Sequence, residues 1–193
     1  LRLDSDTLAS MMRRDAAALG VERFLDEKLV PFIDEVGRGW EEGTVSVRHE
    51  HAATEVIETV LREIRTAVGR SASGDPVILA TLPGELHGLG LQIVALLLAS
   101  RGTPVRVIGI DTPVDEITGA AEATNATAVA LSITEASVPE NTIRAVEALR
   151  SSLPPQTKMV VGGKGARHLA PVPEGVRIAS SLEDLDLLFP HPS

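Results

Sequence analysis

The stretch PVILATLPGELHGLGLQIVALLLAS, residues 76–100, decides the fold. Its first six residues form a short apolar run of the kind that predicts a buried strand, and its last thirteen are apolar enough for a buried helix. A glycine-rich loop that carries His87 joins the two. Ligands of open α/β sheets bind at the carboxyl ends of the strands, so this imidazole is a candidate ligand-binding group.

After this stretch, apolar strands alternate with helical segments, which predicts a parallel sheet with helices on both faces. Five strands favour the flavodoxin-like order 2-1-3-4-5, whose switch point lies between the first and third strands. The loops that begin at Leu82 and Ser132 leave those strands, so we expect His87 and Ser132 to flank one crevice. The predicted strands are Val77–Thr81, Val105–Gly109, Ala128–Ser132, Lys158–Gly162 and Val176–Ala179, and the helical stretches are Gly88–Ser100, Val114–Ala123, Glu140–Ser151, Ala166–Leu169 and Leu182–Phe189.

The amino-terminal third shows helical spacing of its apolar side chains. The predicted helices run from a cap at Asp4–Asp6 to Gly20, from Val21 to near Gly37, and from Thr44 or Ser46 to Val68. Pro31 predicts a kink or a break in the second of them. We therefore expect a helical bundle over residues 1–70, a Ser/Gly-rich linker over 69–75 and a Rossmann-like domain over 76–190.

Composition excludes several functions. The chain has no cysteine, which rules out disulfides and thiolate chemistry and is typical of a cytoplasmic protein. A net charge of −9 disfavours direct binding to a nucleic-acid backbone. No apolar run is long enough for a membrane span, and the first residues do not form a signal peptide. The chain begins with Leu1 rather than methionine, so the sequence leaves open a segment before it.

The loop around His87 carries a recognisable pattern. Glu85-x-His87-x-x-Gly90 resembles the Asp-x-His-x-x-Gly motif of cobalamin-binding domains. The resemblance implies that His87 is the lower axial ligand of cobalt, and that Glu85 orients the imidazole and raises its basicity. Gly88 and Leu89 complete the cofactor-binding loop. The alternative is a loop histidine that is exposed or caps the next helix.

A second pattern lies upstream, where Trp40 is followed after nine residues by Glu50-His51. It resembles the Trp-x9-Glu-His motif of the adenosylcobalamin-binding, light-sensing regulators of the CarH/LitR type, in which a helical bundle covers the upper face of the corrin ring. The resemblance implies that Trp40 lies beside the adenosyl group, that Glu50 accepts hydrogen bonds from the ribose with His51 nearby, and that Val47 packs against the adenosine. The alternative is that Trp40 belongs to the bundle core and Glu50-His51 to a solvated helix face.

Three further short sequence patterns resemble those of the same family. Ser132-Ile-Thr134 matches the first position of its Ser-x-Leu pattern, where a hydroxyl meets the displaced nucleotide base, and Thr134 departs from it. Gly162-Gly163 stands at its Gly-Gly step, where the nucleotide tail passes close to the backbone, although a simple turn is also open. Asp111–Pro113 resembles its Asp-Thr-Pro step, or is only a helix start.

One departure concerns the upper face of the cofactor. In the best-known light-dependent repressors a histidine directly follows the tryptophan and binds cobalt after illumination, whereas this chain has Glu41 there. Water, His49 or His51 is then left for that position, or signalling differs.

Two function classes follow from the resemblance, neither of them enzymatic. The first is an adenosylcobalamin photosensor that regulates transcription by a light-dependent change in assembly, as a homo-oligomer or with a regulatory protein partner; any DNA contact then comes from another domain or a partner. The second is a corrinoid methyl carrier that serves methyltransferases. The Trp-x9-Glu-His pattern favours the sensor. An interaction module that has lost cobalamin is a third reading, against which the retained His87 argues.

Overall fold

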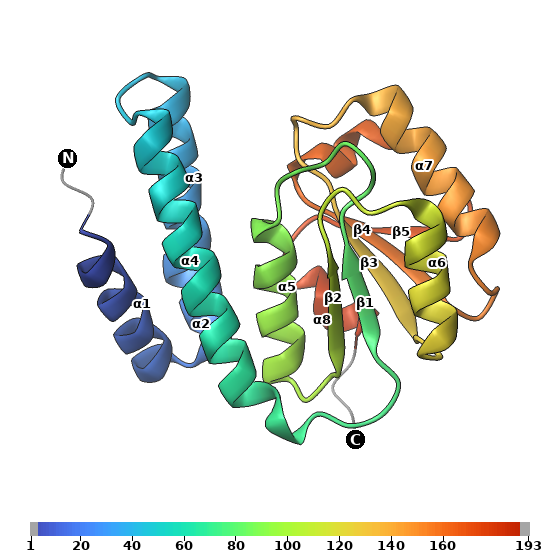
Figure 1. The fold of residues 1–193 in the computed structure, drawn as a ribbon, viewed down its shortest axis with the longest axis horizontal. Coiled ribbons are helices and arrows are strands. Elements are labelled where there is room, and N and C mark those ends of the chain that lie inside the picture. Colours follow the sequence, from blue (N-terminus) through green and yellow to red (C-terminus); the bar gives the residue numbers. More distant parts are fainter. Residues whose placement is uncertain (1–3, 190–193) are drawn as a thin grey trace. The chain divides into compact units, whose positions relative to one another are not determined.

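The computed structural model of this chain describes residues 4–189. The chain divides into two compact units, Leu1–Arg70 and Ser71–Ser193 (Figure 1). The first unit is helical, and the second contains a β-sheet with helices around it. Within residues 4–189, no helix combines the length and the hydrophobicity that crossing a bilayer requires.

The first unit consists of three long helical segments. Its elements are α1 (Ser5–Leu19), α2 (Val21–Phe24), a π-helical turn (Leu25–Leu29), α3 (Val30–Glu41) and α4 (Val47–Val68). The Asp4 carboxylate caps α1 and accepts hydrogen bonds from the backbone N–H and the hydroxyl of Thr7 at 3.3 and 2.7 Å. Gly20 ends α1 with a positive φ of 78°, which a residue without a side chain adopts most readily.

The prediction that the second helix ends near Gly37 is wrong. Residues 21–41 are helical throughout, and α3 continues to Glu41. The π-helical turn lies just before Pro31, where the N–H of Val30 donates to the carbonyl of Leu25, five residues back. The helix thus shifts its register immediately before the residue that offers no N–H. Gly37 keeps a helical backbone, and a glycine ends a helix only where it leaves that conformation.

The core of the first unit is built from side chains of α1, α2, the π-helical turn and α4, whereas α3 has no fully buried side chain. On α4 the buried side chains are Ala53, Ile57, Val60 and Leu61, whose spacing places them on a single stripe. They are buried together with Met12, Ala16, Phe24, Leu25 and Leu29.

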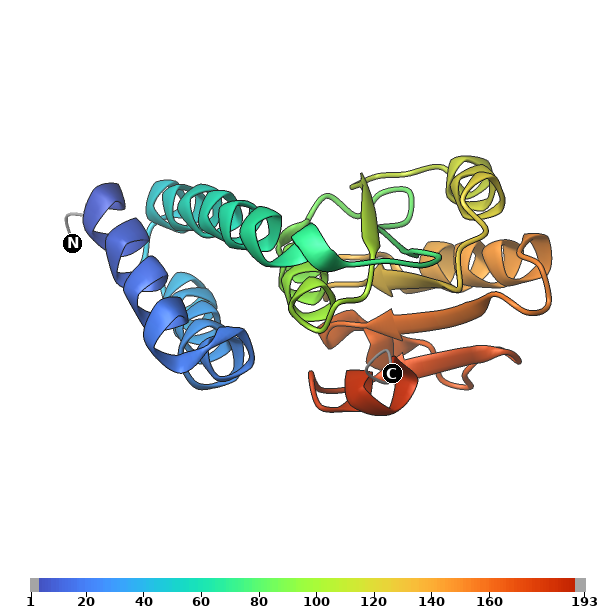
Figure 2. The ribbon, with the colours of Figure 1, turned by 90° about the horizontal axis from the view of Figure 1, so that it is seen from below.

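The second unit contains a sheet of five parallel strands in the order β2-β1-β3-β4-β5. The strands are β1 (Val77–Ala80), β2 (Val105–Gly109), β3 (Ala128–Ser132), β4 (Lys158–Gly162) and β5 (Val176–Ala179), and the helices are α5 (Leu89–Ser100), α6 (Val114–Ala123), α7 (Pro139–Ser152) and α8 (Asp184–Leu188), with 3-10 turns at Gly69–Ser71 and Lys164–His168. The predicted fold class and strand order are confirmed. Helices α6 and α7 lie on one face of the sheet and α5 and α8 on the other (Figures 1 and 2).

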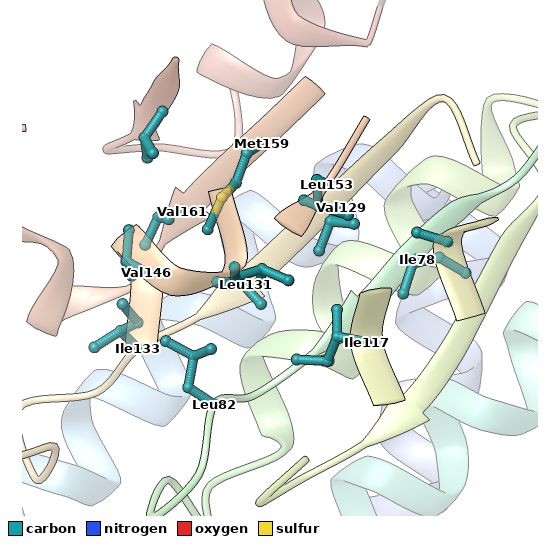
Figure 3. Close-up of a cluster of buried hydrophobic side chains, with 14 of the residues drawn as sticks. Ile78, Leu82, Ile117, Val129, Leu131, Ile133, Val146, Leu153, Met159 and Val161 are labelled. Atoms are coloured by element: carbon teal, nitrogen blue, oxygen red, sulfur yellow. The ribbon is translucent and has the colours of Figure 1, made fainter. Parts of the chain in front are cut away.

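One hydrophobic core of the second unit lies between the sheet and the helices α6 and α7, and α5 buries a further set of side chains on the opposite face of the sheet. Figure 3 shows Ile78 and Val129 near Ile117 of α6, and Val161 near Val146 of α7. The central strand β3 is buried at every position, whereas exposure alternates along the edge strand β2. Because β1 and β3 pair at the centre, the loops that follow them leave the sheet at its switch point.

Candidate functional site

Glu85, in the loop between β1 and α5, is the most heavily bonded side chain at the carboxyl edge of the sheet. Only 3% of its side chain is exposed. Oε1 accepts the backbone N–H of His87 at 2.9 Å and lies 2.6 Å from Nδ1 of the same residue. Oε2 accepts the backbone N–H and the hydroxyl of Thr134 at 2.8 and 2.6 Å, and the hydroxyl of Ser137 at 2.5 Å. One carboxylate therefore links the loop after β1 to the loop after β3.

These bonds decide the charge of Glu85. Burial raises the pKa of its carboxyl group, but the hydrogen bonds from Ser137, Thr134 and the His87 backbone outweigh burial and bring the pKa to about 2. The group is therefore ionised at neutral pH and can only accept hydrogen bonds.

An ionised Glu85 fixes the tautomer of His87. Nδ1 must carry the hydrogen that points at Oε1, so a neutral ring presents the lone pair of Nε2. The His87 side chain is 61% exposed, and no residue in the described range 4–189 forms a hydrogen bond with Nε2. The imidazole is thus oriented on one side and open to a ligand on the other.

Ser132 and Gly90 meet across the switch point. The Ser132 side chain is buried at the end of β3, and a Cβ atom on Gly90 would overlap its Oγ. Gly90 lies in the first turn of α5, which Gly88 caps and Leu89 begins. Because Gly90 has no side chain, it leaves room for the Ser132 hydroxyl.

The glycines at and after the end of β4 allow neighbouring backbone segments to approach closely. Gly163 has a φ of +92°, and a Cβ atom there would overlap the carbonyl oxygen of Ile133. Gly165, which the sequence did not single out, has the same relation to the carbonyl oxygen of Thr134. At Gly162 a Cβ atom would lie 3.3 Å from the carbonyl oxygen of Ala179. These contacts give Gly162 and Gly163 a packing role between neighbouring strands and loops that does not depend on a ligand.

Three exposed apolar side chains lie in the loops that meet at Glu85. Leu86 is 64% exposed, Val138 54% and Ile110 47%. Each directly neighbours, in sequence, a residue that is hydrogen-bonded to Glu85. An apolar, flat ligand would cover side chains that otherwise face water.

Sequence reasoning missed the part that Ser137 plays. Its hydroxyl bonds Glu85 across 52 residues of sequence, and only its place in the short loop between β3 and α7 hinted at it. It also left Asp111 as a family step or a helix start. The structure instead gives Asp111 a positive φ of 50° and a bond from Gly84 N to its Oδ1 at 2.7 Å.

The other predicted residues lie in the helical unit. Trp40, in the last turn of α3, is 51% exposed, so it is not a core residue. Val47, the first residue of α4, is also 51% exposed. The Glu50 carboxylate accepts the hydroxyl of Thr54 at 3.0 Å and lies 2.6 Å from Nδ1 of His51. Helical spacing places Val47, Glu50, His51 and Thr54 on one face of α4.

Two family models match the chain. Residues 76–171 match a model described as B12 binding domain, and residues 1–65 match a second model with the same description. The chain belongs to the family of B12-binding domain proteins. The resemblance stated from the motifs is confirmed, and both matched domains support cobalamin binding.

The curated relatives of this B12-binding chain include transcriptional repressors and corrinoid proteins. The HTH-type transcriptional repressors CarA and CarH of Myxococcus xanthus are 32% and 31% identical over 186 and 189 residues, which cover 95% and 96% of this chain and 62% of each repressor. Trimethylamine corrinoid protein 1 of Methanosarcina mazei is 28% identical over 165 residues, 82% of this chain and 76% of that protein. The chain thus spans about three fifths of the length of the repressors. These relatives are regulators and corrinoid proteins, not catalytic enzymes.

A solved structure shows the same fold. The monomethylamine corrinoid protein of Methanosarcina barkeri superimposes with a TM-score of 0.73 over 95% of this chain and 93% of that chain, at 12% sequence identity. The fold predicted from the sequence, a helical unit followed by a five-stranded parallel sheet, is therefore present in an experimentally determined structure.

Proposed function

We propose that this chain binds adenosylcobalamin and serves as the light-sensing part of a transcription regulator. The observation that carries the proposal is the exposed Trp40, which lies at the end of α3 close in sequence to the polar face of α4 that bears Glu50. An indole half exposed to water in a chain with a single tryptophan is available for a ligand. The names of the repressors CarA and CarH support the regulatory role.

The proposed lower-face residues fit a cobalt corrinoid. The corrin supplies the four equatorial ligands of cobalt, so the protein has to add only one neutral imidazole, and Nε2 of His87 is available. Glu85 would hold that ring in orientation and raise its basicity. Ser132 and Thr134, with the glycine loop 88–90 and Gly162-Gly163, complete the proposed lower site. The exposed Leu86 and Val138 suit the apolar ring system.

The proposed upper-face residues suit adenosine. An indole plane stacks on a purine, and a carboxylate accepts hydrogen bonds from ribose hydroxyls. A carboxylate offers about four acceptor positions, and Thr54 and His51 engage Glu50 at two of them. Val47 adds an exposed apolar side chain on the same helix face. A methyl group in place of adenosine would use none of these residues.

Bound adenosylcobalamin would supply a cobalt–carbon bond that light cleaves. The residues of this chain would bind the cofactor from both faces, and loss of the adenosyl contacts would favour a different packing of the helical unit. We expect this packing to change the oligomeric state, with DNA contact made outside this chain.

A corrinoid methyl carrier is the second candidate function. The observation that favours it is the similarity to trimethylamine corrinoid protein 1, which covers 82% of this chain. The His87 site would serve either role, because both need an imidazole below cobalt. The two functions differ in what the helical unit must recognise.

One experiment separates the two functions. The chain is titrated in the dark with adenosylcobalamin and with methylcobalamin, and each complex is then illuminated with green light under air and passed over a size-exclusion column with light scattering. The sensor predicts tighter binding of adenosylcobalamin and a light-dependent change in both spectrum and mass. Equal affinities with no change in mass would contradict the sensor and favour the carrier.

A further inference from the structure

Glu85 is held from two neighbouring strands, by different parts of the residue. Its carboxylate bonds the loop after β3, through Thr134 and Ser137. Its backbone carbonyl faces the loop after β2 and accepts the hydroxyl of Thr81 at 2.6 Å and the backbone N–H of Asp111 at 3.1 Å. The loop after β2 therefore fixes the main chain at the residue that orients His87.

Asp111 makes most of the contacts on the β2 side. Its N–H also donates to Oγ1 of Thr81 at 2.9 Å, and its Oδ1 accepts the N–H of Gly84 at 2.7 Å. Asp111 thus forms hydrogen bonds with the His87 loop at three residues, Thr81, Gly84 and Glu85. Its backbone N–H makes two of these hydrogen bonds, and its carboxylate makes one.

The backbone around Asp111 is shaped for these contacts. A bulge in the pairing of β1 and β2 places Leu79 opposite Val107 but Ala80 opposite Gly109. Asp111 follows two residues later with a φ of +50°, in a region where aspartate, asparagine and glycine are tolerated best. A helix start alone requires neither the bulge nor the left-handed residue, so this geometry calls for another explanation.

We propose that Asp111 is a positioning residue for the His87 loop, which acts by holding Gly84 and Glu85 so that the imidazole stays aligned for cobalt. This inference rests on the proposed role of His87 as the lower ligand. Within residues 4–189 no hydrogen bond joins Asp111 to the imidazole, so Asp111 would act through the main chain of the loop. It sets the main chain from the β2 side while Thr134 and Ser137 set the carboxylate from the β3 side.

Three substitutions distinguish the role of the Asp111 side-chain oxygen as a hydrogen-bond acceptor from the role of the Asp111 backbone conformation. Asp111→Asn keeps both the oxygen that faces Gly84 N and a tolerance for positive φ. Asp111→Gly keeps the φ and removes the acceptor, and Asp111→Ala removes the acceptor and adds strain. Asp115→Asn, at an exposed position in the first turn of α6, removes the same charge without touching the loop and serves as the control.

The first measurement uses the ligand-free protein. Amide hydrogen exchange is followed at Gly84, whose N–H bonds Asp111, and at His87, whose N–H bonds Glu85. We expect exchange at both amides about 10-fold faster in Asp111→Gly than in the wild type, and near-wild-type exchange in Asp111→Asn and Asp115→Asn. Wild-type exchange in Asp111→Gly would overturn the proposal, whatever the protein binds.

The second measurement uses adenosylcobalamin and methylcobalamin in the dark. We expect Asp111→Gly to weaken both about 10-fold, the lower end of the loss seen when a partner of a metal-bound histidine is removed, and to lower the fraction with the spectrum of imidazole-ligated cobalt. Asp111→Asn should restore both. If Asp111→Ala alone is impaired, strain explains the residue and the positioning role is wrong. If the spectrum of cobalamin bound to the wild-type protein did not depend on His87, the proposed function would be refuted. The hydrogen-exchange result would then decide whether Asp111 positions the His87 loop.

Discussion

Nδ1 of His87 lies 2.6 Å from Oε1 of Glu85, and the carboxylate in this pair is buried while the imidazole is exposed. The asymmetry gives each residue a separate task. The buried carboxylate keeps its charge through hydrogen bonds from Thr134 and Ser137, and the exposed ring turns Nε2 outward. A histidine without such a partner would sample both tautomers and many orientations.

The first prediction concerns this pair. His87→Ala should leave the fold intact, weaken cobalamin binding and remove the spectrum of imidazole-ligated cobalt. Glu85→Gln should weaken binding by about 10–100-fold, because an amide orients the ring less firmly than a carboxylate. Dark absorption titrations measure both effects. His168→Ala, a histidine in the loop after β4, is the matched control, and a spectrum lost equally in that variant would contradict the assignment of His87.

The second prediction concerns stability against pH. The pKa of Glu85 is lowered from 4.5 to about 2, so its ionised form stabilises the folded state. This contribution is complete above about pH 4.5 and is lost as the pH falls toward 2. At about 1.4 kcal/mol per pKa unit, the full contribution is on the order of 3 kcal/mol.

The test compares urea unfolding of the wild type and Glu85→Gln between pH 5 and 2.5. Far-UV circular dichroism is the appropriate signal, because the single tryptophan, Trp40, lies in the helical unit and does not report on the sheet. Because the other acidic groups titrate in both proteins, their effect cancels in the comparison. The difference in the free energy of unfolding should therefore shrink as the pH falls and Glu85 becomes protonated in the wild type. A difference that is constant with pH would show that Glu85 is not the responsible group.

The third prediction concerns the two hydroxyl groups whose hydrogen bonds lower the pKa of Glu85. Thr134→Val and Ser137→Ala each remove one hydroxyl bond to the Glu85 carboxylate. Each should cost about 1.5–3 kcal/mol at neutral pH, the range for a hydrogen bond to a charged group. In the background of Glu85→Gln both losses should become smaller, which a double-mutant cycle measures. Fully additive losses would mean that the hydroxyls stabilise the loop without acting through Glu85.

The fourth prediction tests the packing of the loops after β3 and β4. A Cβ atom on Gly165 would overlap the carbonyl oxygen of Thr134, so Gly165→Ala should destabilise the second unit by about 1–3 kcal/mol. Gly119, within α6, has no atom within 4 Å of such a Cβ, so Gly119→Ala should stabilise the same unit by up to about 1 kcal/mol. Thermal unfolding of both variants checks the opposite signs, and equal effects would refute the crowding at Gly165.

The sequence allowed the sheet to be predicted because each strand is a short, mainly apolar segment with a helical stretch after it. The positions of β2 to β5 and the strand order follow from that pattern, and so does the meeting of the loops that carry His87 and Thr134. The extent of α3 was missed because the shift that accommodates Pro31 lies in backbone hydrogen bonds. Ser137 and Asp111 were not recognised as partners of the His87 loop, since their contacts join residues that are 52 and 27 positions apart.

The fifth prediction concerns the upper face under light. Of the two histidines near Glu50, His51 shares the face of α4 that bears Val47, whereas His49 lies about 200° around the helix from Val47 and bonds Ser46 through Nδ1 at 2.9 Å. His51 pairs with Glu50 through Nδ1, which leaves its Nε2 as the outward nitrogen. If a histidine of this chain binds cobalt after illumination, it should therefore be His51.

Illuminated complexes of the wild type, His49→Ala and His51→Ala decide the matter by absorption and size-exclusion chromatography. We expect His49→Ala to match the wild type and His51→Ala to change the illuminated spectrum. Glu41→His, which places a histidine directly after Trp40 as in the light-dependent repressors that the motif resembles, should give a stable two-imidazole spectrum that no longer depends on His51. A two-imidazole spectrum that persists in His51→Ala but disappears in His49→Ala would show that the face of α4 was assigned wrongly, because only a rotated or unwound first turn could bring His49 to the side of Val47.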